Sequence, residues 1–461
     1  MTPPPPPARP GEPMTTSIVA EDLPKARKRE QRGWYWYDFA NSGFQTTVIT
    51  VFLGPYLTAL AEKAAGRADG FVAFLGFDMR AKAYFSAIVT ISVVLQIVVM
   101  PIAGALADHT GRKKELLALF AYLGAAATLG FYFVAGDAYA LGGALFVTAN
   151  VAFGAAMVIY NSFLPQIAGP EERDAVSSRG WGFGYLGGFL LLALNLALYQ
   201  GSGIDQGLAV RISLASAGLW WAAFTVIPML RLRNRPVGGH DATPGAAIAG
   251  SFRQLGRTIA GLRRYPRTLL FLLAYLIYND GVQTVISFSA TYADQELGLS
   301  KDVQITAILM VQFVAFGGAL LLGWLGARFG TKRTVLASLV VWTAVVGIAY
   351  FLEKGAAVQF YAIAFLIAIV LGGTQALSRS LYSLVIPPGR EAEYFSLFEV
   401  SDKGSALLGS LTLTVALQVT DSYRAAILSL MIFFVVGFAL LMVVNLPRAV
   451  REAGNEPPTH L

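Results

Sequence analysis

The sequence predicts an all-α membrane protein in which twelve transmembrane helices form two six-helix bundles. Three observations support this fold class: the chain is strongly apolar, its apolar runs can cross a bilayer, and its halves share loop motifs. Of the 461 residues, 55% are hydrophobic and only 14% are charged, whereas soluble domains carry about 25% charged residues. A polytopic membrane protein therefore explains the composition better than a soluble domain.

Twelve apolar runs approach the length of about 20 residues that a transmembrane helix needs. In the first half, we predict spans at 34–60, 83–107, 115–135, 140–162, 179–200 and 209–230. In the second half, we predict spans at 268–290, 303–327, 333–352, 357–383, 393–419 and 424–446. The fifth and eleventh spans are the weakest of these predictions because they are rich in Gly and Ser.

Lysine and arginine residues gather in alternate connections between these spans. With the N-terminus in the cytoplasm, the inner connections carry roughly three times as many basic residues as the outer ones. This bias predicts a multi-pass protein of the cell (inner) membrane with both termini in the cytoplasm. It also explains the net charge of +7 without a nucleic-acid partner.

The composition divides the chain into five expected parts. They are a disordered Pro-rich and basic tail (1–33), a first bundle (34–230), a cytoplasmic linker (231–267), a second bundle (268–447) and a C-terminal tail (448–461). The second part of the linker has apolar residues at helical spacing from Ile248 to Leu262, which favours an amphipathic helix on the inner leaflet over a solvated loop. The N-terminus lacks the apolar segment of a signal peptide.

Two loop motifs occur once in each half. The loop after the second predicted helix reads GALADHTGRKK from Gly104, and the loop after the eighth reads GWLGARFGTKR from Gly323. A second match joins LPQIAGPEERD from Leu164 with IPPGREAEY from Ile386. Both matches share an offset of about 220 residues, which indicates a parallel duplication of a six-helix unit.

The motif at Gly104 resembles the signature of the major facilitator superfamily, in its expected loop after the second helix. Four stretches also resemble the bacterial "unknown major facilitator" family, which is related to fungal vacuolar amino-acid effluxers. They are YDFANSGF at Tyr37, GYLGGFLLLALNLAL at Gly184, DGVQT at Asp280 and GGTQALSRSLYSLVIP at Gly372. The resemblance covers nearly the whole chain and implies the major facilitator fold. It departs from the pattern where Ala327 occupies the position that Asp108 has in the first half.

Polar side chains inside the predicted spans mark the candidate site, because a charge near the bilayer centre costs at least about 2.5–3.5 kcal/mol. In the superfamily fold, the first, fourth, seventh and tenth helices line a central cavity. The resemblance therefore implies a substrate or ion site formed by Asn41, Gln45, Tyr160, Asn161, Asp280, Gln283, Gln375 and Arg379. An amino acid's carboxylate would suit Arg379, its ammonium would suit Asp280 or Asp38, and Asp280 is a candidate proton carrier.

A second set of residues is expected to control the conformation. It consists of Asp38, Asp108, Gly111, Arg112, Lys113 and Asp402. The resemblance implies that Asp108 latches the two halves on the cytoplasmic side, where it could approach the N-terminus of the eleventh helix, which favours an anion. The alternative is a solvated turn whose basic residues set the topology.

Arg379 has no partner within its own predicted helix. We therefore predict an ion pair with Asp38, Asp280 or Asp402; a pair with Asp38 would join the halves as a gate. Asp38 could instead cap its helix at the membrane interface. Glu399 and Lys403 are four residues apart, and for them we favour simple mutual neutralisation.

Other classes of function find little support in the sequence. The chain has no cysteine, which excludes disulfides and thiolate metal sites. His109, His240 and His460 lie at no metal-ligand spacing, and no phosphate-binding loop occurs. We therefore expect neither an enzyme, a metal, nor a cofactor.

The sequence thus favours a secondary active transporter that moves a small polar solute, an amino acid or related compound, by alternating access. The expected partners are this solute, the lipid bilayer and, as a candidate coupling ion, the proton; a monomer is expected. Two alternatives stay open: a non-transporting sensor or scaffold, and a transporter of an unrelated solute such as a sugar or drug.

Overall fold

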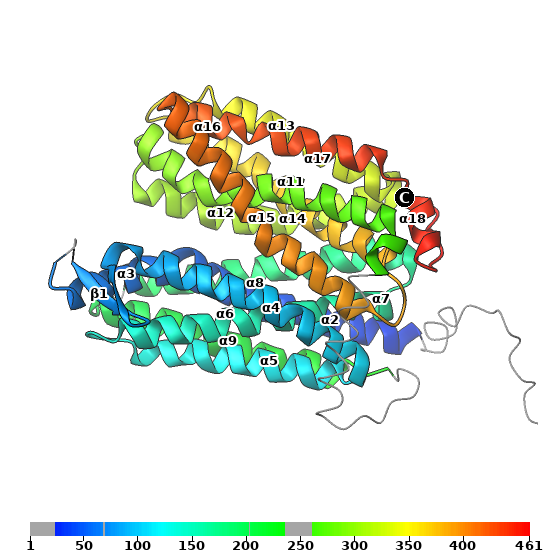
Figure 1. Ribbon diagram of the computed structural model, residues 1–461, viewed down its shortest axis with the longest axis horizontal. Helices are drawn as coiled ribbons and strands as arrows, with labels where there is room; N and C mark the ends of the chain where they lie inside the picture. Colours follow the sequence, from blue (N-terminus) through cyan, green and yellow to red (C-terminus); the bar gives the residue numbers. More distant parts are fainter. Residues whose placement is uncertain (1–23, 68–69, 202, 236–260) are drawn as a thin grey trace, which may run out of the picture.

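The computed structural model describes residues 24–67, 70–201, 203–235 and 261–461. Their helices form two bundles that lie side by side, with the N-terminal bundle in blue to green and the C-terminal bundle in green to red (Figure 1). At one end of both bundles α2 begins, α9 ends and α18 lies. We call it the inner end, because the charge pattern of the sequence predicts that it faces the cytoplasm, and we call the opposite end the outer end.

The N-terminal bundle corresponds to the first six predicted spans. Its helices are α2 (Pro24–Gly43), the π-helix η1 (Phe44–Phe52), α3 (Leu53–Ala64), α4 (Tyr84–Thr110), α5 (Lys113–Leu129), α6 (Tyr139–Ser162), α7 (Leu164–Ile167), α8 (Arg173–Gly201) and α9 (Gln206–Arg231). Between α3 and α4, the strands β1 (Phe71–Phe74) and β2 (Phe77–Arg80) pair as an antiparallel hairpin at the outer end (Figure 1). We did not expect this hairpin from the sequence.

The C-terminal bundle corresponds to the last six predicted spans. Its helices are α11 (Pro266–Thr291), the π-helix η6 (Tyr292–Glu296), α12 (Lys301–Phe329), α13 (Thr331–Ala349), α14 (Ala357–Leu384), α15 (Glu391–Thr420), α16 (Tyr423–Ser429), α17 (Met431–Val443) and α18 (Leu446–Glu452). Within the described ranges, 11 helices are long and apolar enough to cross a membrane. α15 is not among them, and it carries Glu399, Asp402 and Lys403 in its inner half. α15 belongs to the second bundle and also packs against α4 and α6 of the first, and the predicted all-α fold of two six-helix bundles is confirmed.

Two predicted boundaries are wrong. The first helix begins at Pro24 rather than at residue 34, so residues 24–33 belong to a helix and not to a disordered tail. This extension packs against the protein: Gln31 Nε2 donates to the Ile167 carbonyl at 2.9 Å. The expected C-terminal tail also contains a short helix, α18, whose first turn is capped by Asn445. The amphipathic helix expected near 248–262 lies almost wholly outside the described residues.

Each bundle has its own aromatic core, which fixes the helices that carry the site. In the first, the ring of Trp221 lies 5.4 Å from that of Phe44, and Gly124 leaves the space that the Trp221 ring occupies. In the second, Trp342 stacks on Phe434 at 5.5 Å. These large buried rings contribute to packing within each half, so that the contact between halves rests on other residues.

Candidate functional site between the two bundles

The duplicated loop glycines both lie where helices of opposite bundles touch. A Cβ on Gly104 of α4 would stand 2.5 Å from the Ala392 carbonyl oxygen of α15. A Cβ on Gly323 of α12 would stand 2.4 Å from the Ser178 Cβ of α8. The sequence repeat therefore corresponds to a repeated close approach between the two halves.

Replacing Gly104 by Ala is expected to destabilise this contact by about 1–3 kcal/mol, because its neighbour is backbone that cannot turn away. Gly317→Ala is the matched control: this glycine lies on α12, and among the described residues no atom comes within 4 Å of its added Cβ. Thermal unfolding of the purified variants measures the difference. Equal unfolding temperatures for the two variants would contradict the close contact between α4 and α15.

Asp108 sits at the inner end of α4 and reaches the first turn of α15. Its Oδ2 accepts a hydrogen bond from the Glu393 backbone N–H at 2.9 Å. Its Oδ1 lies 2.9 Å from Lys113 Nζ, which also pairs with Glu391 Oε2 of α15 at 3.0 Å. The helix terminus that we expected to attract Asp108 is therefore the one it contacts. Of the other predicted loop residues, Gly111 ends α4 with a φ of 65°, and Arg112 is exposed.

The second copy of the loop is held together differently. Ala327 occupies the position that Asp108 has in the first copy, so the second loop has no acid of its own there. Asp174, on α8 of the opposite bundle, supplies a carboxylate, which accepts a hydrogen bond from Thr331 Oγ1 at 2.5 Å. In both copies the acid therefore lies on the N-terminal bundle: Asp108 belongs to the first loop itself, whereas Asp174 reaches the second loop from the opposite bundle.

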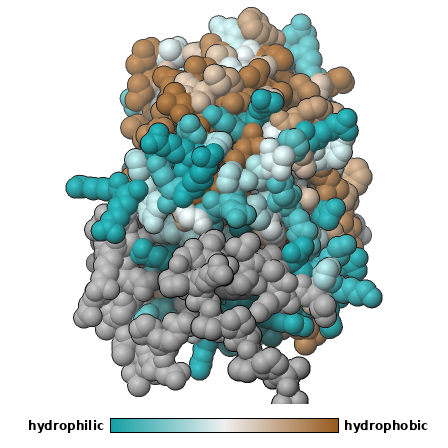
Figure 2. All heavy atoms as spheres, turned by 90° about the vertical axis from the view of Figure 1, so that its right-hand side faces the viewer, coloured by the Kyte–Doolittle hydropathy of each residue, from teal (hydrophilic) through white to brown (hydrophobic). Residues whose placement is uncertain are grey.

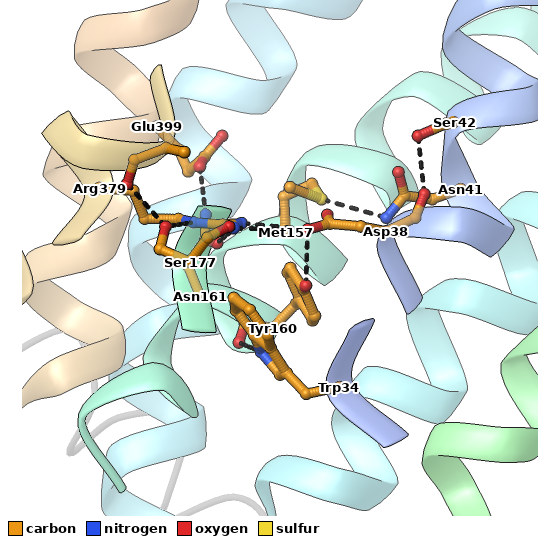
Figure 3. Close-up of polar contacts among 11 residues, drawn as sticks. Trp34, Asp38, Asn41, Ser42, Met157, Tyr160, Asn161, Ser177, Arg379 and Glu399 are labelled. Atoms are coloured by element: carbon orange, nitrogen blue, oxygen red, sulfur yellow. Dashed lines mark hydrogen bonds and ion pairs between the residues drawn. The ribbon is translucent and has the colours of Figure 1, made fainter. Parts of the chain in front are cut away.

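Arg379 of α14 is the centre of the deepest polar contact between the bundles (Figure 3). Its side chain is 1% exposed and points into the N-terminal bundle, where it meets three helices. It pairs with Asp38 Oδ2 of α2 at 3.4 Å and donates to Asn161 Oδ1 of α6 at 3.1 Å. It also donates to the hydroxyl and the carbonyl of Ser177 on α8, both at 2.9 Å. Of the three acids that we considered as partners, Asp38 is the one in contact.

Aromatic side chains surround this ion pair. The Arg379 guanidinium carbon lies 4.7 Å from the ring centre of Trp34, which stacks on Tyr160 at 4.4 Å. The Tyr160 hydroxyl donates to Asp38 Oδ2 at 2.7 Å. A guanidinium over aromatic faces gains about 0.5–2 kcal/mol of cation–π attraction. Asp38 is thus buried within a polar network, which does not fit the alternative of a simple helix cap at the interface.

The polar contact continues to α15. Asn161 Nδ2 donates to Glu399 Oε1 at 2.6 Å, so one amide bridges Arg379 and Glu399. Lys403 instead pairs with Asp402 at 3.0 Å and lies over the Phe153 ring of the N-terminal bundle at 5.9 Å. The closest partners of Glu399 and Lys403 are therefore the amide of Asn161 and the carboxylate of Asp402, and not each other.

Asp402 collects donors from α11. Asn279 Nδ2 donates to its Oδ1 at 2.8 Å and Gln283 Nε2 at 3.3 Å. Asp280 lies apart from this group and is fully buried. Its Oδ1 accepts from Thr284 Oγ1 at 3.3 Å and from the Gly409 N–H at 3.1 Å. Its Oδ2 has no hydrogen-bond partner among the described residues.

Besides Asp280 and Gln283, three predicted site residues make no hydrogen bond to Arg379 among the described contacts. Asn41 is buried and donates to Met157 Sδ at 3.5 Å, Gln45 is half-buried, and Gln375 accepts from the Tyr185 hydroxyl at 3.4 Å. The structure conversely adds Trp34 and Ser177, which we did not single out. Trp34 directly precedes the polar stretch that contains Asp38, so the aromatic run WYWY was an available signal; Ser177 had none.

The geometry closes the inner end in two layers. The first layer, at the helix ends, is the contact among Asp108, Lys113 and Glu391. The second layer, deeper between the bundles, is the Asp38–Arg379 pair with Asn161. Ion pairs and hydrogen bonds thus join the two bundles at this end, and such contacts can form and break as the bundles move. Such an arrangement, in a twelve-helix duplicated fold, defines a membrane transporter of the major facilitator type.

The chain belongs to the family described as "Vacuole effluxer Atg22 like", whose model matches residues 26–454. The Bacillus subtilis protein described as "Uncharacterized MFS-type transporter YxiO" is 30% identical over 90% of this chain and 95% of its own length. "Autophagy-related protein 22-1" of Penicillium rubens is 25% identical over 94% of this chain and 92% of its own length. The family resemblance inferred from the sequence is confirmed.

Solved structures agree on the fold. The E. coli fucose:proton symporter FucP is similar with a TM-score of 0.64 at 15% identity, over 90% of this chain and 97% of that one. A bacterial homologue of the iron transporter ferroportin has the same TM-score and identity, over 90% and 98%. At this identity the likeness shows the major facilitator fold alone. The homologues and these neighbours are transporters and not enzymes.

Proposed function

We propose that the protein is a secondary active transporter that moves an amino acid or a related small polar solute by alternating access. The observation that carries the proposal is the buried Asp38–Arg379 pair, which joins α2 of one bundle to α14 of the other. A buried ion pair contributes little net stability, because desolvation offsets much of its attraction. Its value here lies in making and breaking the contact between the halves.

The chemistry of Arg379 supports a carboxylate-bearing solute. A guanidinium presents a planar fork of donors that matches a carboxylate. In this arrangement Asp38, Asn161 and Ser177 already occupy that fork. A solute carboxylate would therefore compete with Asp38, so that binding and opening of the inner end become one event. The ammonium of an amino acid would then suit the released Asp38, or Asp280.

The proposed location is the cell membrane, with both termini in the cytoplasm. The inner end carries the basic residues of α2 and the linker side of α9, as the positive-inside rule expects. The state described is then one in which the cytoplasmic side is closed.

A screen of thermal unfolding tests the choice of solute. The purified protein is mixed with amino acids, small peptides, sugars and nucleosides across pH, and each stabilising compound is then tested as a labelled solute in proteoliposomes. We expect amino acids to stabilise the protein and to cross the membrane in a saturable way. Flux of a sugar or drug alone would overturn the substrate class, and a folded protein that moves none of them would favour a sensor or scaffold.

We further propose that Asp280 carries the coupling proton, since its buried carboxylate faces an N–H and a hydroxyl and no cation of the described residues. Asp280→Asn keeps the acceptor oxygen and removes the titratable group. We expect it to lose accumulation driven by a pH gradient while keeping exchange of solute across the membrane. Uptake by the unmodified protein that ignores an imposed pH gradient would contradict the proposal.

A further inference from the structure

A cavity of about 410 Å³ opens at the inner end, away from the contact between the bundles. It is lined by Lys25, Lys28, Arg29 and Arg32 of α2 and by Arg231, the last residue of α9. All five are basic. Figure 2 looks onto this end of the molecule, where hydrophilic side chains gather in the middle of the described surface and hydrophobic ones lie above them.

The four α2 residues form a single stripe. Their spacing of i, i+3, i+4 and i+7 places them on one face of the helix. The opposite face is docked on the protein: Gln31 donates to the Ile167 carbonyl. The packing of α2 against the protein therefore fixes the direction of the stripe, which faces the cavity.

The acids next to this stripe are already paired with other cations. Glu30 pairs with Arg235 at 2.7 Å, and Glu172 pairs with Arg27 at 3.0 Å. Neither Arg235 nor Arg27 lines the cavity. Within the part of the chain that the structure describes, the five lining side chains consequently have no acidic partner, and their mutual repulsion favours an anionic ligand.

Arg231 is held in the cavity wall by a close approach. A Cβ on Gly33 would stand 2.6 Å from the Arg231 Cβ, so the glycine leaves the space in which this side chain passes α2. Arg32 and Arg231 therefore face the cavity from two helices. Two arginines that line one cavity offer guanidinium groups that suit the oxygen atoms of a phosphate group.

We propose that this cavity binds the phosphate-bearing headgroup of an anionic phospholipid from the leaflet at the inner end. The position favours a lipid over a soluble anion. Arg231 ends a membrane-spanning helix, and Trp34, two residues after Arg32, is already buried in the bundle. The cavity therefore lies at the level where a spanning helix leaves the hydrocarbon, and basic pockets at that level bind lipid headgroups.

Unfolding temperatures in detergent test the site with three probes: phosphatidylglycerol, phosphatidylcholine and inorganic pyrophosphate at constant ionic strength. We expect phosphatidylglycerol to raise the unfolding temperature by about 3–8 °C when it is about 100-fold above its dissociation constant. Arg32→Gln/Arg231→Gln should abolish this shift. The charge-matched control, Arg328→Gln/Arg333→Gln, changes two exposed arginines at the inner end of the C-terminal bundle and should keep it.

Two further variants keep the test decisive if the glutamine variant folds poorly. Arg32→Lys/Arg231→Lys retains both charges and should retain most of the shift, whereas Gly33→Ala displaces Arg231 and should reduce it. An equal shift with phosphatidylcholine, or in the glutamine variant, would overturn the site. An equal shift with pyrophosphate would overturn the lipid and assign the cavity to a soluble phosphate compound.

Discussion

Replacing Asp38 by Asn is expected to destabilise the closed protein by about 3–5 kcal/mol and to abolish transport, because the buried Arg379 charge loses the carboxylate that pairs with it directly. The side chain of Arg379 is 1% exposed, so water cannot take over the role of the lost carboxylate. The hydroxyl of Tyr160 still finds an oxygen at position 38. The loss of stability should therefore reflect the missing negative charge and not a change in the shape of the side chain.

The double variant Asp38→Asn/Arg379→Gln separates a pair from two independent residues. Without either charge the site has no uncompensated ion, so the double variant should recover most of the stability lost in each single variant while transport stays low. The exposed pair Asp294–Lys301, at 3.5 Å, is the control; its loss should cost about 1 kcal/mol or less. Losses that simply add in the double variant would show that the two charges do not depend on each other.

Replacing Asp108 by Asn is expected to weaken the closed inner end by about 1.5–3 kcal/mol, since a charge-assisted hydrogen bond to the start of α15 is lost. The lost contacts are those to the Glu393 N–H and to Lys113. Lys113 lies on the same bundle as Asp108, but the contact to the Glu393 N–H forms only when the bundles meet at this end, so the open arrangement should become more populated.

Crosslinking across the inner end measures this shift. The chain has no cysteine, so Asp174→Cys/Thr331→Cys introduces one thiol on each bundle at positions whose side chains are 2.5 Å apart. A short thiol crosslinker should join them readily in the parent and more slowly with Asp108→Asn. Asp302→Asn, an exposed acid at the outer end of α12, should change nothing. Equal crosslinking with Asp108→Asn would mean that Asp108 is a solvated turn residue and not a latch.

The helices and the duplication were predictable because both depend on local pattern. Apolar runs fix the approximate spans, and the repeat at Gly104 and Gly323 already implied two equivalent halves. The latch could also be anticipated, since an acid at a helix terminus is a general electrostatic preference. The predicted start of the first helix was wrong, because the residues that hold the beginning of α2, Ile167 and Glu172, lie far away in the sequence.

The deeper layer of the site, around the Asp38–Arg379 pair, was predictable only in part. An arginine inside a span needs a partner, which limited Arg379 to a few acids, but periodicity cannot say which helix faces which. Ser177 contributes two acceptors to Arg379 through its hydroxyl and its backbone carbonyl. A serine in a Gly-rich helix carries no signal of that role. The same limit explains why Glu399 was paired with its neighbour Lys403 instead of Asn161 on another helix.

The labelling of Ser178→Cys tests most directly whether the Asp38–Arg379 pair holds the inner end closed. Ser178 of α8 is 1% exposed beside Gly323 of α12, and its hydroxyl has no hydrogen-bond partner among the described residues. A cysteine there fits the site and can react with a bulky maleimide only when the bundles separate. With Asp38 and Arg379 intact we expect slow labelling, and with Asp38→Asn we expect labelling at least about tenfold faster, as a shift of about 1.4 kcal/mol or more would give. Equal labelling rates in the two proteins would contradict the gate.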